Sequence, residues 1–315
     1  MKNFFYITSL ILFIFFTILL ITLSTTGYET TRFNKIISQK INSKNKNISL
    51  KLLKIKFKLD IKKVSLFLET ENPILNYQNL NVPIKNIKVY VDFISLIKAK
   101  PKIDKINISS KEINIDLLKK IFLKTKPSNL NSLVTNKIIN GKLIANIELY
   151  FDNNLNIKNF ITKGKVKDMQ ANMNSEFILK KKSFNFFSDN TDTLITNIKS
   201  KTDGFTINNG DIKVEKKKNI IVQSSLSTNV NINKKNINNY KKYFKNIKYI
   251  NKQTNLKANL THNLKISFDN TYKVTDYIYK SIGNVDNIEL KLNQPIKSTF
   301  LKNNINNISF KESDL

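Results

Sequence analysis

The sequence of 315 residues contains no cysteine and no tryptophan, and its single histidine is His262. Without cysteine the chain forms neither disulfide bonds nor thiolate zinc sites. One imidazole is also too few for a metal centre built from several histidines. The chain has only six glycines, and none stands in a GxGxxG or P-loop arrangement, which argues against a glycine-rich phosphate-binding loop. We therefore expect no metal and no cofactor.

Negative charge is scarce as well, because 53 lysines and arginines stand against 23 acidic residues and give a formal charge of +30. Arg32 is the only arginine. Proteins that bind phosphate through fixed geometry usually use arginine, whose planar guanidinium forms two parallel hydrogen bonds. The lysines alternate with apolar residues, so we interpret them as the solvated face of β-strands in preference to a nucleic-acid-binding surface. Attraction of this face to anionic lipid headgroups is a second interpretation.

The first feature present is an uncharged apolar run from Phe4 to Leu23. At about 1.5 Å per residue, a helix of this length spans the hydrocarbon core of a bilayer. A signal peptide has a shorter apolar core, of about 7–15 residues, and a cleavage site of small residues that the sequence at 24–27 does not resemble. We therefore predict an uncleaved anchor within 1–26. More positive residues follow the run than precede it, but this bias is a weak guide for long domains, so the sequence leaves the orientation open.

From residue 47 onward, apolar residues recur at every second position, with Lys, Asn, Ser, Thr and Asp between them. This alternation predicts antiparallel β-strands with one apolar and one solvated face. Dipeptides typical of turns occur between the strands, at Asn72-Pro73, Asn140-Gly141, Asp203-Gly204 and Asn209-Gly210. The residues of the apolar phase that we expect to form a shared lining are Ile55, Phe57, Val64, Leu66, Leu68, Ile87, Val89, Val91, Ile106, Ile108, Ile113, Ile115, Leu143, Ala145, Ile147 and Leu149.

Segments with helical periodicity are few and short. They are 29–43 beside the anchor, 93–98, 117–124 with Asp116 as N-cap, 130–138, 240–250, and 274–282 ending at Gly283. We divide the chain into an anchor at 1–26, a juxtamembrane helix and linker at 27–46, a module of strands and short crossing helices at 47–138, and a continuing β region at 139–315.

These helices are too few to cover the apolar faces of all the predicted strands, and large uncovered apolar faces are rare in water. Either the sheet folds on itself as a sandwich, or it curls into an open groove that another apolar molecule fills. The pattern alone does not choose between the two. A lipid acyl chain suits such a groove, because it requires continuous apolar side chains and no catalytic group. A closed sandwich would instead serve as a scaffold for protein partners.

Residues 1–116 resemble the amino-terminal module of the AsmA-like family, which includes the TamB and YhdP proteins of diderm bacteria. The resemblance lies in the anchor and in two strand segments, IKFKLDIKKVSLFLE and PIKNIKVYVDFISLIKAKPKIDKINISSKEINI. In the second segment a strand runs into the short helical crossing Phe93-Ile94-Ser95-Leu96-Ile97, and the next strand begins at Ile103. Lys98-Ala99-Lys100 stands where the family usually has a glycine.

The resemblance implies a single-pass inner-membrane protein with its amino terminus in the cytoplasm and its bulk in the periplasm. It implies a mainly β fold, in which a long, curved antiparallel sheet forms an open hydrophobic groove along the residues named above. The implied role is phospholipid transport or outer-membrane homeostasis, without enzymatic activity. The partners would be the membrane, phospholipid acyl chains and other envelope proteins. A membrane-tethered scaffold and a membrane-tethered nucleic-acid binder are the alternative functions.

Three polar groupings have simpler interpretations than a catalytic or metal site. His262 lies between Leu260 and Leu264, and we interpret it as a solvent-facing side chain on the polar phase of a strand. Glu69 and Glu71 lie at a predicted strand end, where both carboxylates would stay solvated. The segment 189–192 contains two aspartates but lacks the ligand spacing of a calcium loop, so it predicts a turn.

Overall fold

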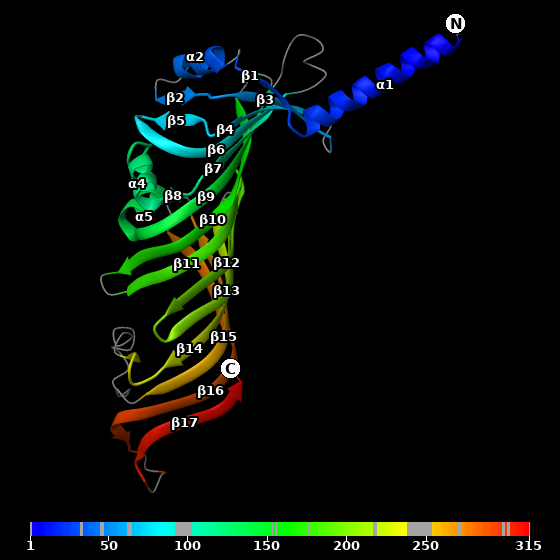
Figure 1. Cartoon of the computed structure of the whole chain (residues 1–315). Helices are drawn as coiled ribbons and strands as arrows, with labels where there is room; N and C mark the ends of the chain where they lie inside the picture. Colours follow the sequence, from blue (N-terminus) through cyan, green and yellow to red (C-terminus); the bar gives the residue numbers. More distant parts are fainter. Residues whose placement is uncertain are drawn as a thin grey trace. The chain divides into compact units, whose positions relative to one another are not determined.

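In the computed structural model the chain is mainly β, with one long helix at its amino end and short helices elsewhere (Figure 1). The predicted fold class, an open antiparallel sheet that follows an amino-terminal helix, is confirmed. The helices predicted at 93–98 and 240–250 lie outside the described residues and stay predictions. The structure describes residues 2–31, 34–44, 47–61, 65–91, 103–152, 154, 156–174, 177–216, 219–237, 254–269, 273–297, 300 and 303–314.

Figure 1 labels the helices and strands. The described helices are α1 (Lys2–Ser24), α2 (Asn34–Lys44), α4 (Ile115–Leu123) and α5 (Asn129–Lys137). The strands are β1 (Tyr28–Thr30), β2 (Ile48–Lys51), β3 (Ile55–Asp60), β4 (Ser65–Glu71), β5 (Ile74–Tyr77), β6 (Leu80–Val91), β7 (Ile103–Ser110), β8 (Ile113–Asn114), β9 (Ile138–Phe151), β10 (Ile157–Asn174), β11 (Phe177–Ser188), β12 (Asp192–Thr202), β13 (Phe205–Lys216), β14 (Ile220–Ile232), β15 (Asn255–Phe268), β16 (Val274–Ile296) and β17 (Ile305–Asp314).

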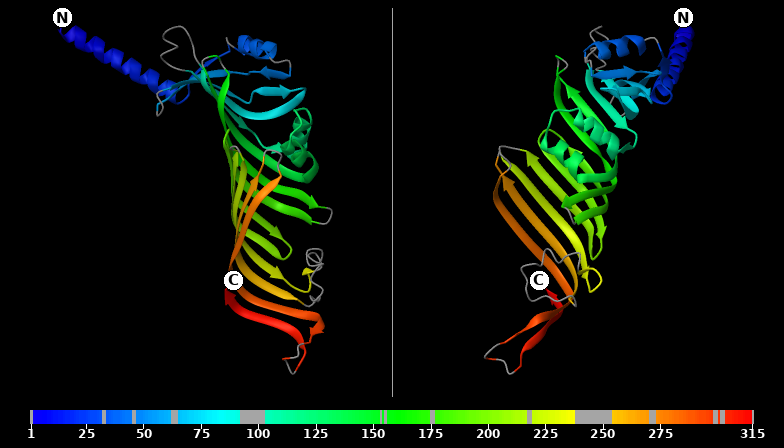
Figure 2. Two further views of the ribbon diagram at one scale, coloured as in Figure 1. Left: turned by 180° about the vertical axis from the view of Figure 1, so that it is seen from behind. Right: turned by 90° about the vertical axis from the view of Figure 1, so that its left-hand side faces the viewer.

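The chain forms two compact units, Met1–Asn136 with Lys142–Gly164, and Lys137–Gly141 with Lys165–Leu315. In the first unit the antiparallel ladder runs from β1 through β3, β4, β6 and β7 to β9. β2 and β5 form a short ladder that joins at β6. In the second unit β11 to β17 follow one another as antiparallel neighbours, several of which lie side by side in both views of Figure 2. Most pairings therefore join strands that are close in sequence, because short connections place consecutive strands side by side.

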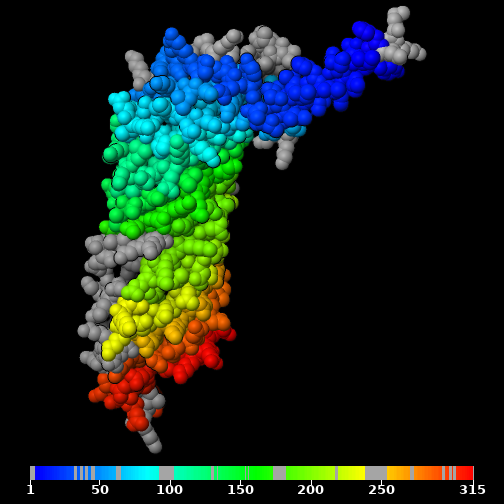
Figure 3. Space-filling view, in the orientation of Figure 1, coloured from blue at the N-terminus to red at the C-terminus, as the bar shows by residue number. Residues whose placement is uncertain are grey.

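Helix α1 has the composition of a membrane-spanning segment. Its window Phe4–Ser24 has a mean hydropathy of 2.7 and none of it is buried, and Figure 3 shows its side chains projecting clear of the strands of the first unit. The hydroxyls of Thr8 and Thr17 donate to the carbonyl oxygens of Phe4 and Phe13, each over 2.8 Å, so the polar groups are satisfied inside the helix. A single membrane span and a signal sequence share this length and composition.

Two predicted helices begin at different residues in the structure. The helix expected over 29–43 is shorter at its start, because β1 pairs with β3 and α2 begins only at Asn34. The helix expected at 117–124 begins at Ile115, so Asn114 occupies the N-cap position and the predicted cap by Asp116 is wrong. Asp116 lies in the first turn of α4, where the helix dipole favours a carboxylate. α5 matches the helix predicted at 130–138.

The helix predicted at 274–282 is wrong, because this segment is the first part of β16. Val274, Ile278 and Ile282 are four positions apart, and this spacing also fits alternate positions of a strand. The segment forms a strand because β15 pairs with β16 along most of its length and satisfies its backbone hydrogen bonds. Gly283, expected to end a helix, lies within the strand opposite Leu260.

One of the four predicted turns is confirmed, because Asp203-Gly204 connects β12 to β13, with Gly204 at a φ of 88°. Asn72-Pro73 lies between β4 and β5, but both strands pair antiparallel with β6, so the chain does not reverse there and this prediction is wrong. Asn140-Gly141 and Asn209-Gly210 are instead inside β9 and β13, so these two predictions are wrong. The second dipeptide follows a register shift between Ile207 and Asn209, which is a β-bulge rather than a reversal of the chain.

Candidate functional site

In the first unit the alternating apolar residues of neighbouring strands meet in rows across the sheet. Directly opposed residues on antiparallel strands point to the same side, so each row belongs to one face. These rows therefore form a face of mostly apolar side chains across β3, β4, β6, β7 and β9. The rows are Phe57–Leu68–Val89–Ile106–Leu149, Thr70–Ile87–Ile108–Ile147 and Leu66–Val91.

One part of this face is filled by the protein itself. Ile55 is 3% exposed and forms a buried cluster with Leu50 and Leu52, against which Leu68 and Ile87 pack. Leu50 belongs to β2, so the short ladder of β2 and β5 covers this part of the sheet. The other predicted lining residues of the rows are half-buried and belong to no buried cluster among the described residues: Phe57, Leu66, Val89, Ile106, Ile108, Ile147 and Leu149.

The remaining predicted lining residues lie at or near the ends of their elements. Val91 and Ile113 are buried, and Ile113 lies opposite Leu143 on β9. Ala145, the next residue of that phase, is half-buried. Ile115 is also buried, but it is the first residue of α4 and not a strand residue, so its predicted place at a strand end is wrong. Val64 lies outside the described residues.

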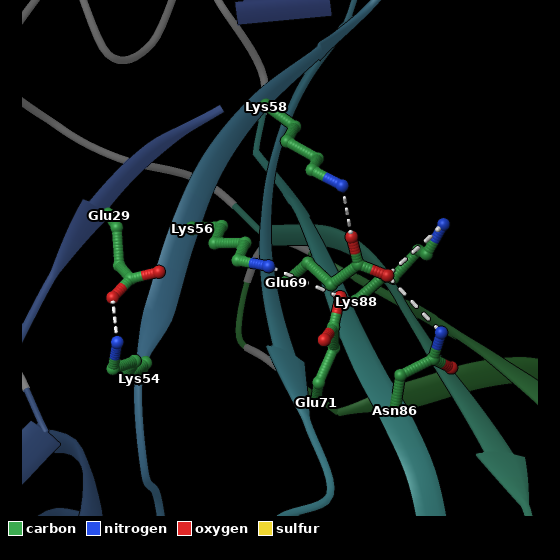
Figure 4. A network of polar contacts seen from close by, with 8 residues as sticks. All are labelled: Glu29, Lys54, Lys56, Lys58, Glu69, Glu71, Asn86 and Lys88. Atoms are coloured by element: carbon green, nitrogen blue, oxygen red, sulfur yellow. Dashed lines mark hydrogen bonds and ion pairs between the residues drawn. The ribbon is translucent and has the colours of Figure 1, made fainter. Parts of the chain in front are cut away.

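The opposite face of the same strands carries a network of charged side chains (Figure 4). Glu69 is 5% exposed; its Oε2 lies 2.9 Å from Lys58 Nζ, and its Oε1 lies 3.5 Å from Lys88 Nζ and accepts a hydrogen bond from Asn86. The prediction that Glu69 stays solvated is therefore wrong, whereas Glu71 is exposed as expected. Burial opposes ionisation of Glu69, but the two lysines outweigh it and hold its pKa below the ordinary value.

A second part of this network surrounds Glu148. Its Oε2 accepts hydrogen bonds from Tyr150 Oη over 2.8 Å and from Lys105 Nζ over 3.4 Å. The Lys105 ammonium also lies 4.7 Å from the ring centre of Tyr90. Burial and the neighbouring carboxylate raise the pKa of Tyr150 to about 12. These charges satisfy one another, so we interpret this face as a structural layer and not as a paired acid and base.

The second unit repeats the division into two faces. Val230, Ala258 and Val285 lie in one row across β14, β15 and β16 and form part of a buried cluster. Farther along the same face, Tyr279 lies opposite Leu264 and Tyr277 lies opposite Ile266. These two tyrosines are 56% and 70% exposed. The apolar face of this unit is therefore packed in one part and open to solvent in another.

His262 is half-buried on this apolar face, so its predicted place on the polar phase of the strand is wrong. It shares the strand phase of Leu260 and Leu264, two positions away on either side. Its Nε2 lies 2.8 Å from Thr228 Oγ1, and its Nδ1 lies 2.8 Å from Tyr279 Oη. Burial lowers the pKa of His262. Counting positions along the strand would have found this placement.

The segment at 189–192 forms the predicted turn between β11 and β12. Asp189 Oδ1 accepts hydrogen bonds from the backbone N–H groups of Thr191 and Asp192, each over 2.8 Å. Within the described part of the chain, no three acidic or histidine side chains lie close enough to hold a metal ion. Comparison with protein-family models, with curated proteins and with solved structures yields no match to this chain.

Proposed function

We propose that this chain is a membrane-anchored, non-enzymatic protein of the AsmA-like type whose apolar sheet faces hold phospholipid acyl chains. In this proposal α1 stays uncleaved in the inner membrane with its amino terminus in the cytoplasm. The two units then lie in the periplasm and contribute to phospholipid transport or outer-membrane homeostasis.

The observation that carries the proposal is the row Phe57–Leu68–Val89–Ile106–Leu149, which joins β3, β4, β6, β7 and β9. Acyl chains are long and apolar, so a surface that holds them requires apolar side chains on successive strands. The charged network on the opposite face gives the sheet two different sides. The exposed Tyr277 and Tyr279 on the apolar face of the second unit add a surface that water solvates poorly.

The test measures phospholipid that stays bound when the full chain is purified from membranes in mild detergent. The Val89→Asp variant places a carboxylate in the middle of the row, and burying an unpaired charge against hydrocarbon is costly. We expect mass spectrometry to find phospholipid bound to the wild-type chain and about tenfold less bound to the variant, a factor that corresponds to about 1.4 kcal/mol.

The matched control is Asn107→Asp, which adds the same group on β7, the strand beside Val89, but on the opposite face. Asn107 lies between Lys88 and Glu148 in the charged ladder, so the new carboxylate has a lysine on one side and a like charge on the other. This control should keep its lipid. A wild-type chain that carries no phospholipid, or a Val89→Asp variant that binds as much as the wild type, would show that the apolar face does not serve this purpose.

A further inference from the structure

The second unit contains a lysine whose position differs from that of the solvated lysines. Lys182 on β11 is only 4% exposed. The next residue, Ser183, lies opposite Lys199, which is exposed on the solvated face. Successive strand residues point to opposite faces, so Lys182 points to the apolar face, in the same phase as Phe184.

The described pairs between β11 and β12 end at Ser183 opposite Lys199. Continuing that antiparallel register by one residue would bring Lys182 opposite Ser200. Ser200 is 3% exposed, and its Oγ has no hydrogen-bond partner among the described residues. On its other side Ser200 lies opposite Ile207, which is in the same phase as Phe205 of the buried cluster.

A buried ammonium group requires a counter-charge or a set of hydrogen-bond acceptors. Within the described residues, no carboxylate pairs with Lys182, and burial lowers its pKa to about 8. Near neutral pH the amine is therefore still mostly protonated. Among the described residues, the unit thus contains a buried cation that has no carboxylate partner and a buried hydroxyl that has no hydrogen-bond partner. An anionic oxygen would satisfy both, because each can donate a hydrogen bond to it.

We propose that Lys182 and Ser200 form an anion-binding site on the apolar face of the second unit, which takes the phosphate of an anionic amphiphile. This inference rests on the proposed function, because the acyl chains of the same molecule would lie along the apolar face beside the site. The shared chemistry is a phosphate oxygen, and it can come from a lipid headgroup or from free phosphate.

The experiment measures binding by the full chain in detergent to two lipid probes, phosphatidylglycerol and phosphatidylcholine, and to inorganic phosphate alone. The Lys182→Met variant removes the charge and keeps the length of an apolar side chain. We expect the wild type to prefer phosphatidylglycerol and this preference to fall about tenfold in the variant, in keeping with the strength of charge-assisted hydrogen bonds. Ser200→Ala should lower the preference by a smaller factor.

The control is Lys199→Met, which removes the same charge from the solvated face one strand away and should leave the preference unchanged. Binding of inorganic phosphate that Lys182→Met abolishes would identify the ligand as free phosphate, with the same two groups as its site. Equal binding of both lipids by the wild type, or a preference that survives in Lys182→Met, would overturn the inference while leaving lipid binding itself intact. Absence of all lipid binding would instead refute the proposed function.

Discussion

Lys58 and Glu69 form an ion pair across β3 and β4, with Nζ 2.9 Å from Oε2 and the acidic side chain only 6% exposed. Lys88 approaches the same carboxylate from β6 on the other side. The carboxylate thus links three neighbouring strands of the first unit. A charge buried in this way is tolerated only while its partners are present, so loss of any one of the three charges should destabilise the first unit.

The Glu69→Gln variant should unfold more easily than the wild type. It removes the negative charge and leaves Lys58 and Lys88 facing a neutral amide, a change that costs about 1–3 kcal/mol for partly buried groups. Urea unfolding of the full chain in detergent, followed by circular dichroism, measures the difference. Glu29→Gln is the control, because the ion pair of Glu29 with Lys54 is exposed and its loss should have no measurable effect. Equal stability of Glu69→Gln and the wild type would contradict this account.

The first unit should lose stability in acid. The pKa values of Glu69 and Glu148 are held below their ordinary value of 4.5, because nearby hydrogen bonds and charges outweigh burial. A carboxylate whose pKa is lowered by folding stabilises the folded protein at pH values above the pKa that the group has in the unfolded chain. This contribution is lost as the pH falls through the pKa that the group has in the folded chain. Unfolding midpoints measured from about pH 6 to about pH 3 should therefore decrease, and Glu69→Gln should show a smaller decrease. A midpoint that does not change over this range would refute the prediction.

Gly283→Ala should destabilise the second unit. A Cβ at this position would clash with the backbone oxygen of Asn259 and would lie 2.9 Å from Leu260 Cα, so β15 or β16 must shift. Overpacking of this kind costs about 1–3 kcal/mol. Thermal unfolding of the variant should show a lower midpoint, while Asn284→Ala, at the exposed next position, should leave the midpoint close to that of the wild type. A normal midpoint for Gly283→Ala would mean that the two strands are not paired as described.

His262 should make the second unit sensitive to mild acid. Burial lowers its pKa from the ordinary value of 6.5, so the unfolded chain binds a proton more readily than the folded chain. The contribution of neutral His262 to the free energy of unfolding is therefore complete above the pKa that it has in the unfolded chain. This contribution is lost as the pH falls through the pKa that it has in the folded chain. The wild-type melting temperature should be lower at about pH 5 than at about pH 7.5, and His262→Gln should reduce this difference. An equal difference in both proteins would exclude His262 as its source. Because carboxylates titrate at lower pH, the two acid effects are separable.

Local patterns in the sequence were sufficient to predict the apolar helix, the alternating strands, α5 and the turns at 189–192 and 203–204. They failed where one pattern fits two structures. The spacing of Val274, Ile278 and Ile282 suits a helix and a strand equally well. The Asn-Gly dipeptide at 209 suits both a hairpin turn and a bulge. In each case hydrogen bonds to the adjacent strand decided the outcome, and that strand lies outside the short segment that carries the pattern.

The sequence by itself determined which residues alternate, and therefore that each strand has an apolar and a polar side, because side chains of a strand point to opposite faces in turn. Only the tertiary structure decided which strands are neighbours and in what register. That register buried Glu69 between two lysines and filled the space near Ile55 with Leu50 and Leu52, and the fold buried Lys182 in the second unit. The physical reason is that strand pairing depends on backbone hydrogen bonds between separate strands, which the pattern within one strand does not encode.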